Sequence, residues 1–366
     1  MSRIISIGTA VPEYGTHQQA ILKFMHNAYA NDTASRKLNI LFGNSGINTR
    51  YSVISDFDEA RNRHTLFNGN AVIPAIDKRL DLFREKALPL AFEAIKAAFE
   101  QNELHGYESD ITHLITVTCT GLHAPGLDAA IIELMNLPRD IFHTSVNFLG
   151  CNAAFPALKI ADMIAKTDEN SKILIVCVEL CTLHFKPKNN NDNLLSNAIF
   201  GDGAAAAIVV PDKFAGQQGL YGLTINGFYS LLLNRGKELM GWNINPSNFE
   251  MVLDSSVPAF IGDMAIDIML KAGKKLNFDP DHISKWAVHP GGKKILDTLK
   301  KQLHLNETDL YYSYKILEEY GNMSSSTILF VLNKIMRDIE KPGETVFSLG
   351  FGPGLNIETS LLTYAK

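Results

Sequence analysis

Cys151 lies in the segment NFLGCNAAFPALKIADMIA, where a glycine precedes the thiol and small residues with helical periodicity follow it. This pattern predicts a tight turn that places the thiol at the N-terminus of a helix. Free backbone N–H groups and the helix dipole lower a thiol pKa at such a position, so we expect Cys151 to form a thiolate. A thiolate can take an acyl group from another thioester; a buried structural cysteine is the alternative interpretation.

His289 and Asn322 complete a candidate set of reactive residues. His289 ends an apolar run in WAVHPGGKKILD, and ligands of α/β proteins bind at such strand ends, although a satisfied core histidine is the alternative. Asn322, in YGNMSSSTILFVLNKIM, is either a helix N-cap or a donor in the same pocket. An imidazole N–H and an amide N–H together can hold a carbonyl oxygen while it becomes an enolate. This chemistry suits decarboxylation of a malonyl thioester.

An internal repeat with an offset of 171 residues predicts that the three residues meet. Residues 110–121 (DITHLITVTCTG) correspond to residues 281–292 (DHISKWAVHPGG), and Gly150-Cys151 corresponds to Gly321-Asn322. Further along, ILIVCVEL corresponds to VFSLGF, again without a gap. If two halves share one fold about a pseudo-twofold axis, the thiol, the imidazole and the amide converge at their junction.

The elements that position these residues are expected to form α/β layers. Apolar β-rich runs alternate with amphipathic stretches such as LPLAFEAIKAAFEQ, which indicates helices that cover a mixed or parallel sheet. The length of 366 residues fits two domains or one duplicated fold. The most loop-like segment is KPKNNNDN, at residues 186–193.

Charge and hydropathy exclude several classes of function. The 34 Lys and Arg residues against 39 Asp and Glu residues give a net charge of −5, so there is no basic excess for a nucleic-acid partner. No apolar run approaches the roughly 18 residues that a membrane helix needs. The first residues, MSRIISIGTAVPEYG, lack a longer hydrophobic region and a cleavage site, so a cytoplasmic protein without membrane insertion is expected.

The four cysteines are too few for a disulfide framework. Cys177 and Cys181, with His184 behind them, have a spacing that could bind a metal. They lie in ILIVCVELCTLHF, however, and this apolar, β-branched run is typical of a buried strand. We therefore predict two core thiols and no metal site.

Three further features should shape the pocket. Phe200, before the small-residue run GDGAAAAIVV, is either core or pocket wall. Asp202, between two glycines, is expected to bond backbone groups in a turn. SLGFGPGLNIETS, at residues 348–360, has the glycines of a phosphate loop, but Pro353 and a β-like run follow instead of a helix. We expect a rigid loop that closes the site.

Four motifs together resemble one enzyme family: FGDGAAA at residues 200–206, HPGG at 289–292, YGNMSSS at 320–326 and GFGPGLNIET at 350–359. Their order and spacing are similar to those of the type III polyketide synthases, the chalcone synthase-like members of the thiolase superfamily. The resemblance implies a homodimer of the five-layer αβαβα thiolase-like fold. We place its pseudo-twofold related halves at residues 1–215 and 216–366.

The resemblance also implies an acyltransferase reaction. Cys151, His289 and Asn322 match the family's catalytic triad. The cysteine takes a starter acyl group from coenzyme A, and the other two residues support decarboxylation of malonyl-CoA. The enolate then attacks the enzyme-bound thioester in a Claisen condensation, once or several times. No bound cofactor is implied, because the coenzyme A thioesters are substrates.

Residues for substrate and coenzyme A binding carry over by position. Phe200 matches a gatekeeping phenylalanine between the coenzyme A tunnel and the cavity, and Ser196, Gly201 and Ser324 fall where the family lines that cavity. The sequence departs from the plant enzymes at Met251, in place of a second gatekeeping phenylalanine, and at His184, in place of a small threonine. Of the residues that bind coenzyme A phosphates only Lys37 is kept, with Arg36 and Arg50 as substitutes, so an acyl carrier protein stays open as donor.

Three other functions share features with this sequence. A β-ketoacyl-acyl-carrier-protein synthase III has the same fold and triad but condenses once, and HPGG, GFGPG and the greater length argue against it. The order Cys, His, Asn also fits a papain-like hydrolase, but its Cys-Gly-Ser-Cys-Trp context is missing. A non-catalytic scaffold would be expected to have lost a member of the triad.

Overall fold

The computed structural model describes residues 1–61, 64–67, 73–102, 104, 106–233 and 235–366. Nine strands form one sheet in the order β11-β12-β13-β8-β1-β7-β6-β4-β5. One half consists of β1 (Ser2–Ala10), β4 (His113–Thr118), β5 (Phe142–Asn147), β6 (Ile173–Leu180) and β7 (Asp202–Pro211). The other consists of β8 (Gly222–Leu232), β11 (Lys285–Val288), β12 (Thr345–Gly352) and β13 (Asn356–Ala365).

The two halves repeat the same strand order outward from the junction between β1 and β8. In both, a parallel pair is followed by two antiparallel pairings: β4-β6-β7-β1 in one half and β11-β12-β13-β8 in the other. β4 and β6 therefore correspond to β11 and β12, as the sequence repeat predicts. The proposed boundary at residues 215 and 216 falls inside a short helix, α7 (Asp212–Gln217), and the exact division stays a prediction.

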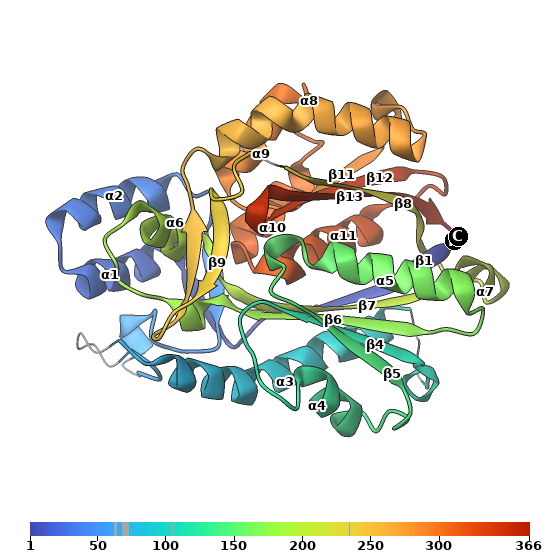
Figure 1. The fold of residues 1–366 in the computed structure, drawn as a ribbon, viewed down its shortest axis with the longest axis horizontal. Helices are drawn as coiled ribbons and strands as arrows, with labels where there is room; N and C mark the ends of the chain where they lie inside the picture. Colours follow the sequence, from blue (N-terminus) through green and yellow to red (C-terminus); the bar gives the residue numbers. More distant parts are fainter. Residues whose placement is uncertain (62–63, 68–72, 103, 105, 234) are drawn as a thin grey trace.

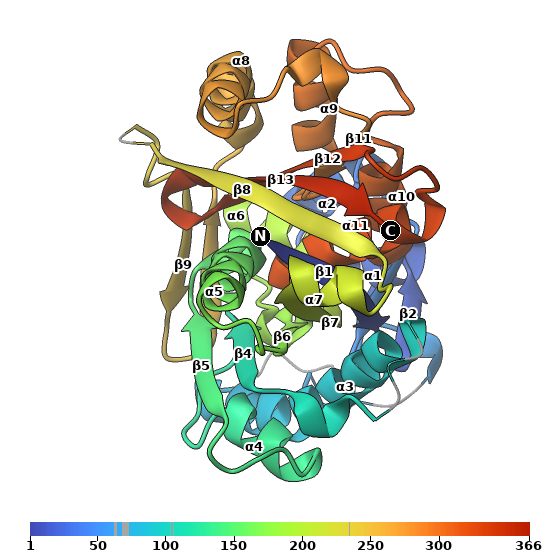
Figure 2. The same ribbon diagram turned by 90° about the vertical axis from the view of Figure 1, so that its right-hand side faces the viewer.

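Helices and sheet halves alternate in five layers (Figure 1). α3 (Ile76–Gln101) and α4 (Leu127–Leu134) cover the outer side of the first half, and α8 (Val257–Leu276) and α9 (Lys293–Gln302) cover the second. Between the halves lie α5 (Ala154–Thr167), α10 (Tyr311–Tyr320) and α11 (Thr327–Asp338). Figure 2 shows the same layers from the side.

The central helices can lie between two sheets because their sequences allow close packing. α5 buries alanines at helical spacing, namely Ala154, Ala157, Ala161 and Ala165. α11 buries a nearly continuous apolar run from Ile328 to Leu332. Both helices follow turns that carry residues of the predicted triad, so the central layer fixes the position of the site.

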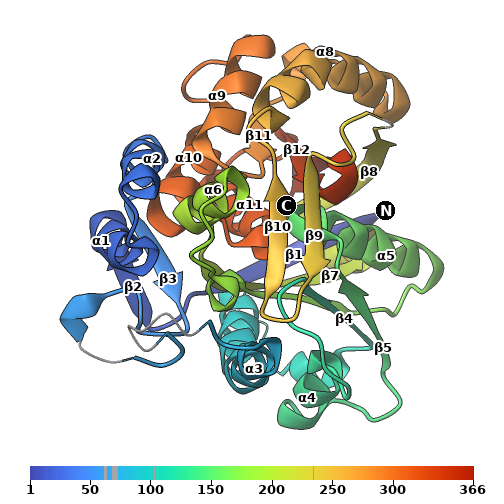
Figure 3. The same cartoon turned by 60° about the vertical axis from the view of Figure 1, so that its left-hand side comes forward.

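The remaining elements gather on one side of the layers, beside the site (Figure 3). They are α1 (Gln18–Tyr29), α2 (Asp32–Gly43), α6 (Asn191–Ile199), the pair β2 (Tyr14–His17) and β3 (Thr49–Ser52), and the hairpin of β9 (Met240–Ile244) and β10 (Phe249–Leu253). Short 3₁₀ turns are η1 (Glu59–Arg61), η2 (Glu108–Asp110), η3 (Gly150–Asn152), η4 (Cys181–His184), η5 (Pro280–His282), η6 (Ser324–Ser326) and η7 (Pro353–Leu355). The predicted loop at residues 186–193 ends early, since α6 begins at Asn191.

Within the described ranges, no helix is both long and apolar enough to cross a membrane.

Candidate active site

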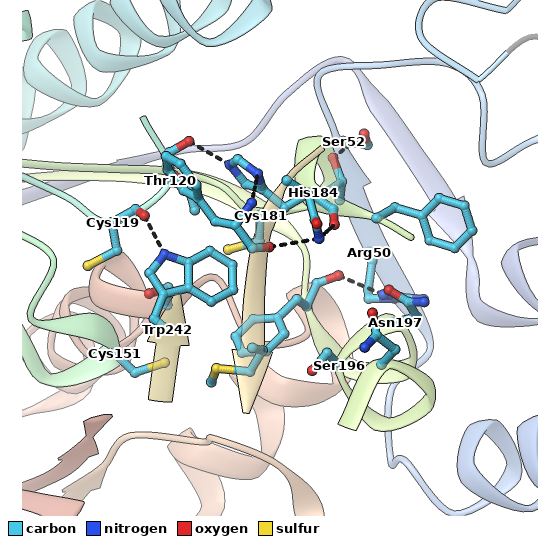
Figure 4. A pocket seen from close by; sticks show the side chains of 18 of the residues that line it. Arg50, Ser52, Cys119, Thr120, Cys151, Cys181, His184, Ser196, Asn197 and Trp242 are labelled. Atoms are coloured by element: carbon cyan, nitrogen blue, oxygen red, sulfur yellow. Dashed lines mark hydrogen bonds between the residues drawn. The ribbon is translucent and has the colours of Figure 1, made fainter. Parts of the chain in front are cut away.

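Two adjoining cavities surround Cys151. The smaller encloses about 320 Å³ and is lined by all three residues of the predicted triad, Cys151, His289 and Asn322. The larger encloses about 920 Å³, and Figure 4 shows the side chains around it. Cys151, Phe200 and Met251 line both cavities. The thiol is thus accessible from two spaces, with an aromatic and a methionine side chain in the wall between them.

Cys151 is held at the end of a tight turn. It lies in η3, directly before α5, and Gly150 has a positive φ of 78°. A Cβ at Gly150 would overlap the ring of Pro353, so only glycine fits both the conformation and the space. Pro353 belongs to the predicted closing segment at residues 348–360. This segment forms β12, η7 and β13, a tight hairpin turn that contacts η3 directly.

Asn322 lies 171 residues further along, at the equivalent turn of the second half. Its Nδ2 is 4.0 Å from the Cys151 Sγ and donates to the carbonyl oxygen of Gly291 at 3.3 Å. Its Oδ1 accepts the backbone N–H of Ser324 at 2.8 Å. Asn322 does not cap α11, which begins five residues later at Thr327. The carboxamide is oriented so that its donor group faces the thiol.

His289 follows β11 and is almost completely buried. Its backbone N–H donates to Leu349, which fixes the strand end, while its ring nitrogens have no hydrogen-bond partner among the described residues. Burial lowers the pKa of His289 to about 3. The imidazole is therefore neutral at physiological pH, and it can accept one proton from a group in the smaller cavity.

The thiol pKa differs from the sequence expectation. Burial raises the pKa of Cys151 to about 11, against hydrogen bonding with the side chains of Ser324 and Asn322, which lowers it. The buried Glu179 raises it further. In the empty site the direction of this pKa shift is opposite to the expected one, because loss of hydration disfavours the anion more than these donors stabilise it. Burial thus favours the neutral form of both Cys151 and His289 in the empty site.

Of Ser196, Gly201 and Ser324, which were predicted to line the substrate cavity, the two serines do so. Ser196, on α6, and Ser324, in η6, line the larger cavity, and the Ser196 hydroxyl has no partner in the described part of the chain. Gly201 packs instead on the backbone near Tyr320, and its N–H donates to the Asn322 carbonyl at 2.9 Å. It contacts a triad residue through the backbone and is not among the residues that line either cavity.

His184 lines the larger cavity but has no free ring nitrogen. Its Nε2 donates to the Thr120 carbonyl at 2.7 Å, and its Nδ1 accepts the Phe249 N–H at 3.1 Å. The ring stacks on Phe249 with centroids 4.4 Å apart, and burial lowers the pKa of His184 to about 3. It offers an aromatic surface to a ligand, but both of its nitrogens are occupied by these hydrogen bonds and are not available to bind a metal. Among the described residues, no group of side chains gathers in a metal-binding arrangement.

The β9–β10 hairpin supplies pocket residues that the sequence analysis missed. The Trp242 indole donates to the Cys119 carbonyl at 2.6 Å, and Asn248 donates to the His184 carbonyl at 3.1 Å. Both residues line the larger cavity with Phe249. The segment NPSN between the two strands is a turn signal that could have revealed the hairpin.

The other cysteines divide between core and pocket. Cys177 is completely buried in the sheet, as predicted. Cys181 is also buried but lines the larger cavity together with Cys119, so its prediction as a core thiol was incomplete. The difference arises because Cys181 lies one residue beyond β6, in η4, where the chain turns toward the cavity.

The three basic residues proposed for coenzyme A lie in two different environments. Arg36 and Lys37 are exposed on α2, and the Lys37 Nζ donates to Asn191 at the start of α6 at 3.0 Å. Arg50 is buried on β3 and lines the larger cavity. Its guanidinium donates to the Phe200 carbonyl at 2.6 Å, so it does not share the surface with the other two.

Asp202 bonds backbone groups, as predicted, but across three segments instead of within its own turn. Its carboxylate accepts the N–H of Val53 at 2.9 Å and the N–H and hydroxyl of Thr182 at 2.8 and 2.6 Å. Burial raises the pKa of Asp202 to about 6. The residue joins β3, η4 and β7 beneath the larger cavity.

The chain is similar to one protein family over nearly all of its length. Residues 1–213 match the model described as chalcone and stilbene synthases, N-terminal domain, and residues 232–365 match the corresponding C-terminal domain. The chain is 28% identical to probable polyketide synthase 1 of Dictyostelium discoideum, over 99% of this chain but 11% of that protein. It is 28% identical to 3,5-dihydroxyphenylacetyl-CoA synthase of Streptomyces toyocaensis and 29% identical to bisdemethoxycurcumin synthase of Oryza sativa subsp. japonica. Each of these two matches covers 99% of this chain, and 90% and 92% of the respective relative.

Solved structures show the same likeness. The polyketide synthase PKS-I from the brown alga Ectocarpus siliculosus superposes with a TM-score of 0.91 at 29% identity, over 100% of this chain and 98% of that one. The C-terminal type III polyketide synthase domain of a type I/III hybrid from Dictyostelium superposes with a TM-score of 0.87 at 26% identity, over 99% of both chains.

Proposed function

This chain belongs to the chalcone and stilbene synthase family, and from that premise we propose that Cys151, His289 and Asn322 form its catalytic centre. The family predicted from the four sequence motifs is confirmed, and so is the thiolase-like α/β fold. The protein is a type III polyketide synthase, an acyltransferase and condensing enzyme that uses malonyl-CoA as extender. For each of the three residues we propose a role that its position supports.

The first step is acyl loading. The Cys151 Sγ attacks the thioester carbonyl of an acyl-CoA, and its proton moves to the neutral imidazole of His289 as the new thioester forms. Coenzyme A leaves as a thiolate and takes that proton back. The shared cavity supports this step, because His289 has two ring nitrogens without a hydrogen-bond partner among the described residues and one of them can accept the proton.

The second step is decarboxylation and condensation. Malonyl-CoA loses CO₂, and the electron pair of the broken C–C bond moves onto the thioester as an enolate. The Asn322 Nδ2 and a His289 ring N–H donate to the enolate oxygen. The enolate carbon then attacks the acyl carbon on Cys151 and releases the thiol as a thiolate that is reprotonated. The product is a coenzyme A thioester longer by two carbons, which can be loaded again.

The observation that carries this proposal is the convergence of three distant side chains on one cavity, with the Asn322 amide 4.0 Å from the thiol. In the test, Cys151→Ala should abolish acyl loading, seen by mass spectrometry of the intact protein. Asn322→Ala should still load but decarboxylate malonyl-CoA about 10²–10³-fold more slowly, the usual cost of one such donor. Cys181→Ala is the matched control and should load normally, because Cys181 lines the larger cavity, which Cys151 also lines.

Unimpaired decarboxylation by Asn322→Ala, or loading at another residue in Cys151→Ala, would contradict these roles. Counting the malonyl units consumed per product in the same assay distinguishes repeated condensation from a single condensation of the synthase III type.

We further propose that the acyl donors are coenzyme A thioesters and that Arg36 and Lys37 contact their phosphates. Lys37 is bonded to Asn191 on α6, the helix whose residues Asn193 and Ser196 line the larger cavity. Both cations are exposed and therefore accessible to an incoming nucleotide. Arg50, the third residue predicted to contact coenzyme A, is instead buried and bonded to the Phe200 carbonyl.

A homodimer is the proposed assembly. β5 ends the nine-stranded sheet, so one of its edges has no partner strand in the described part of the chain. Phe142 on this strand is 54% exposed, Leu149 beyond it is 43% exposed, and Met163 on α5 is 65% exposed. A free strand edge beside apolar side chains is a surface that a second copy can cover.

A further inference from the structure

Arg50 forms part of a buried network that no step above uses. Arg50 is only 5% exposed, and its Nε donates to the Gln18 Oε1 at 2.9 Å. The Nη1 donates to the Phe200 carbonyl at 2.6 Å, and the Gln18 Nε2 donates to the Ala198 carbonyl at 2.7 Å. Two side chains from β3 and the start of α1 therefore hold two carbonyls of the segment 198–200.

We propose that Gln18 and Arg50 act as a clamp that positions Asn322 for enolate stabilisation. The inference rests on the catalytic role proposed for Asn322 above. It makes Arg50 a positioning residue and not a ligand for coenzyme A.

The clamp reaches Asn322 through the backbone. The Asn322 N–H donates to the Ile199 carbonyl at 2.9 Å, and the Asn322 carbonyl accepts the Gly201 N–H at 2.9 Å. Phe200 and Asn322 thus form an isolated parallel bridge. Both backbone hydrogen-bonding groups of Asn322 are tied to the residues on either side of Phe200. A shift of the segment 198–201 must therefore shift the carboxamide.

Close packing leaves this connection little freedom. Gly321 has a positive φ of 71°, and a Cβ there would lie 2.8 Å from the Ile199 carbonyl oxygen and 2.9 Å from the Arg50 Cγ. A Cβ at Gly201 would lie 3.0 Å from the Tyr320 carbonyl oxygen. The two glycines let the segments approach, and the methylene groups of Arg50 fill the space beside them.

The chemistry of the clamp favours arginine. Only a planar fork with several donors can hold the Gln18 amide and the Phe200 carbonyl in fixed relative positions, whereas a lysine offers one centre. The guanidinium also lies 5.6 Å from the Phe42 ring centroid. Burial lowers the pKa of Arg50 to about 9, against the charge of Asp202, so the cation persists at neutral pH.

The test compares two half-reactions in Arg50→Lys and Gln18→Met. We expect malonyl-CoA decarboxylation to fall at least about tenfold in kcat, because the enolate donor is misplaced, while acyl loading of Cys151 changes less than about threefold. Arg3→Gln is the matched control, since Arg3 is also 5% exposed and bonds a backbone carbonyl, that of Leu220 at 2.7 Å. It lies on β1 and lines neither cavity, so it should lower the melting temperature without changing the ratio of the two rates.

A double-mutant cycle with Asn322→Ala decides between positioning and direct action. If Arg50 acts through Asn322, Arg50→Lys should cause almost no further loss of decarboxylation in the Asn322→Ala background. Three results would each overturn the clamp. The first is that Arg50→Lys lowers decarboxylation equally in the wild-type and Asn322→Ala backgrounds, and the second is that it lowers loading and decarboxylation equally. The third is a raised KM for coenzyme A thioesters with unchanged kcat. Normal decarboxylation by Asn322→Ala alone would instead overturn the catalytic role of Asn322.

Discussion

At the residue scale, the acid–base state of the site follows from burial more than from local sequence. Cys151 and His289 are both enclosed, and each is driven toward its neutral form. A raised thiol pKa means that formation of the proposed nucleophile depends on a proton acceptor near Cys151. Such a site should react slowly with reagents that need a preformed thiolate.

This state predicts the pH dependence of Cys151 alkylation. Because the pKa of about 11 lies above the working range, the thiolate fraction increases with pH, and the rate of reaction with iodoacetamide should rise about tenfold per pH unit between about pH 6 and pH 9. The rate is measured by mass spectrometry of the peptide that contains Cys151. A rate that levels off below about pH 8 would instead indicate a lowered pKa and a thiolate paired with imidazolium.

The convergence of Cys151, His289 and Asn322 on one cavity could be predicted from sequence because each residue has a local signal. A glycine turn precedes Cys151 and Asn322, and a strand end precedes His289. The pKa directions could not be predicted, since they depend on everything packed around the site. The role of His184 was equally hidden, because its partner Phe249 lies 65 residues further along the chain.

At the element scale, the contact between η3 and η7 holds Cys151, the proposed nucleophile, in place. Gly150 and Pro353 come from the two halves of the chain and pack directly on each other. Gly352 similarly packs against the Asn152 carboxamide, whose Nδ2 donates to the Asn356 carbonyl at 3.1 Å. The turn after β12 is therefore part of the support for Cys151.

Gly150→Ala should separate this contact from simple backbone strain. The variant combines a positive φ of 78° with an overlap against Pro353, so we expect a loss of more than about 3 kcal/mol in unfolding free energy and loss of Cys151 acylation. Gly219→Ala is the matched control, because Gly219 has a φ of 65° and open space around it. It should cost only about 1–2 kcal/mol and keep acylation. If urea unfolding shows that Gly150→Ala and Gly219→Ala lose the same unfolding free energy, the Pro353 contact contributes nothing.

The sequence repeat predicted some elements and failed at others for identifiable reasons. The strand pairs β4 with β11 and β6 with β12 keep their apolar β-rich runs, so the offset matches them correctly. β5 has no counterpart, because the equivalent residues, 313–318, belong to the amphipathic segment YYSYKILEEY and form α10. The β9–β10 hairpin lies outside the repeat, and with it Trp242 and Phe249 escaped prediction.

At the scale of the whole molecule, the duplicated fold is asymmetric at its two ends. Among the described residues, β11 forms one edge of the sheet. The first half extends one strand beyond its counterpart, and this extra strand, β5, forms the other edge. Most of its residues are exposed, and Leu149 lies between this edge and Cys151. Covering the edge would therefore also enclose the turn that carries Cys151.

Phe142→Asp tests the proposed dimer through this edge. In a twofold assembly each copy contributes the same surface, so one substitution places two carboxylates in the interface and should convert the protein to a monomer in sedimentation velocity. Leu270→Asp is the matched control, because Leu270 is 64% exposed on α8, on the opposite side of the layers, and should leave the assembly unchanged. A dimer that survives Phe142→Asp, or dissociates equally with Leu270→Asp, would place the interface elsewhere. If the β5 edge supports η3, the monomer should also load Cys151 more slowly than the dimer at the same concentration of active sites.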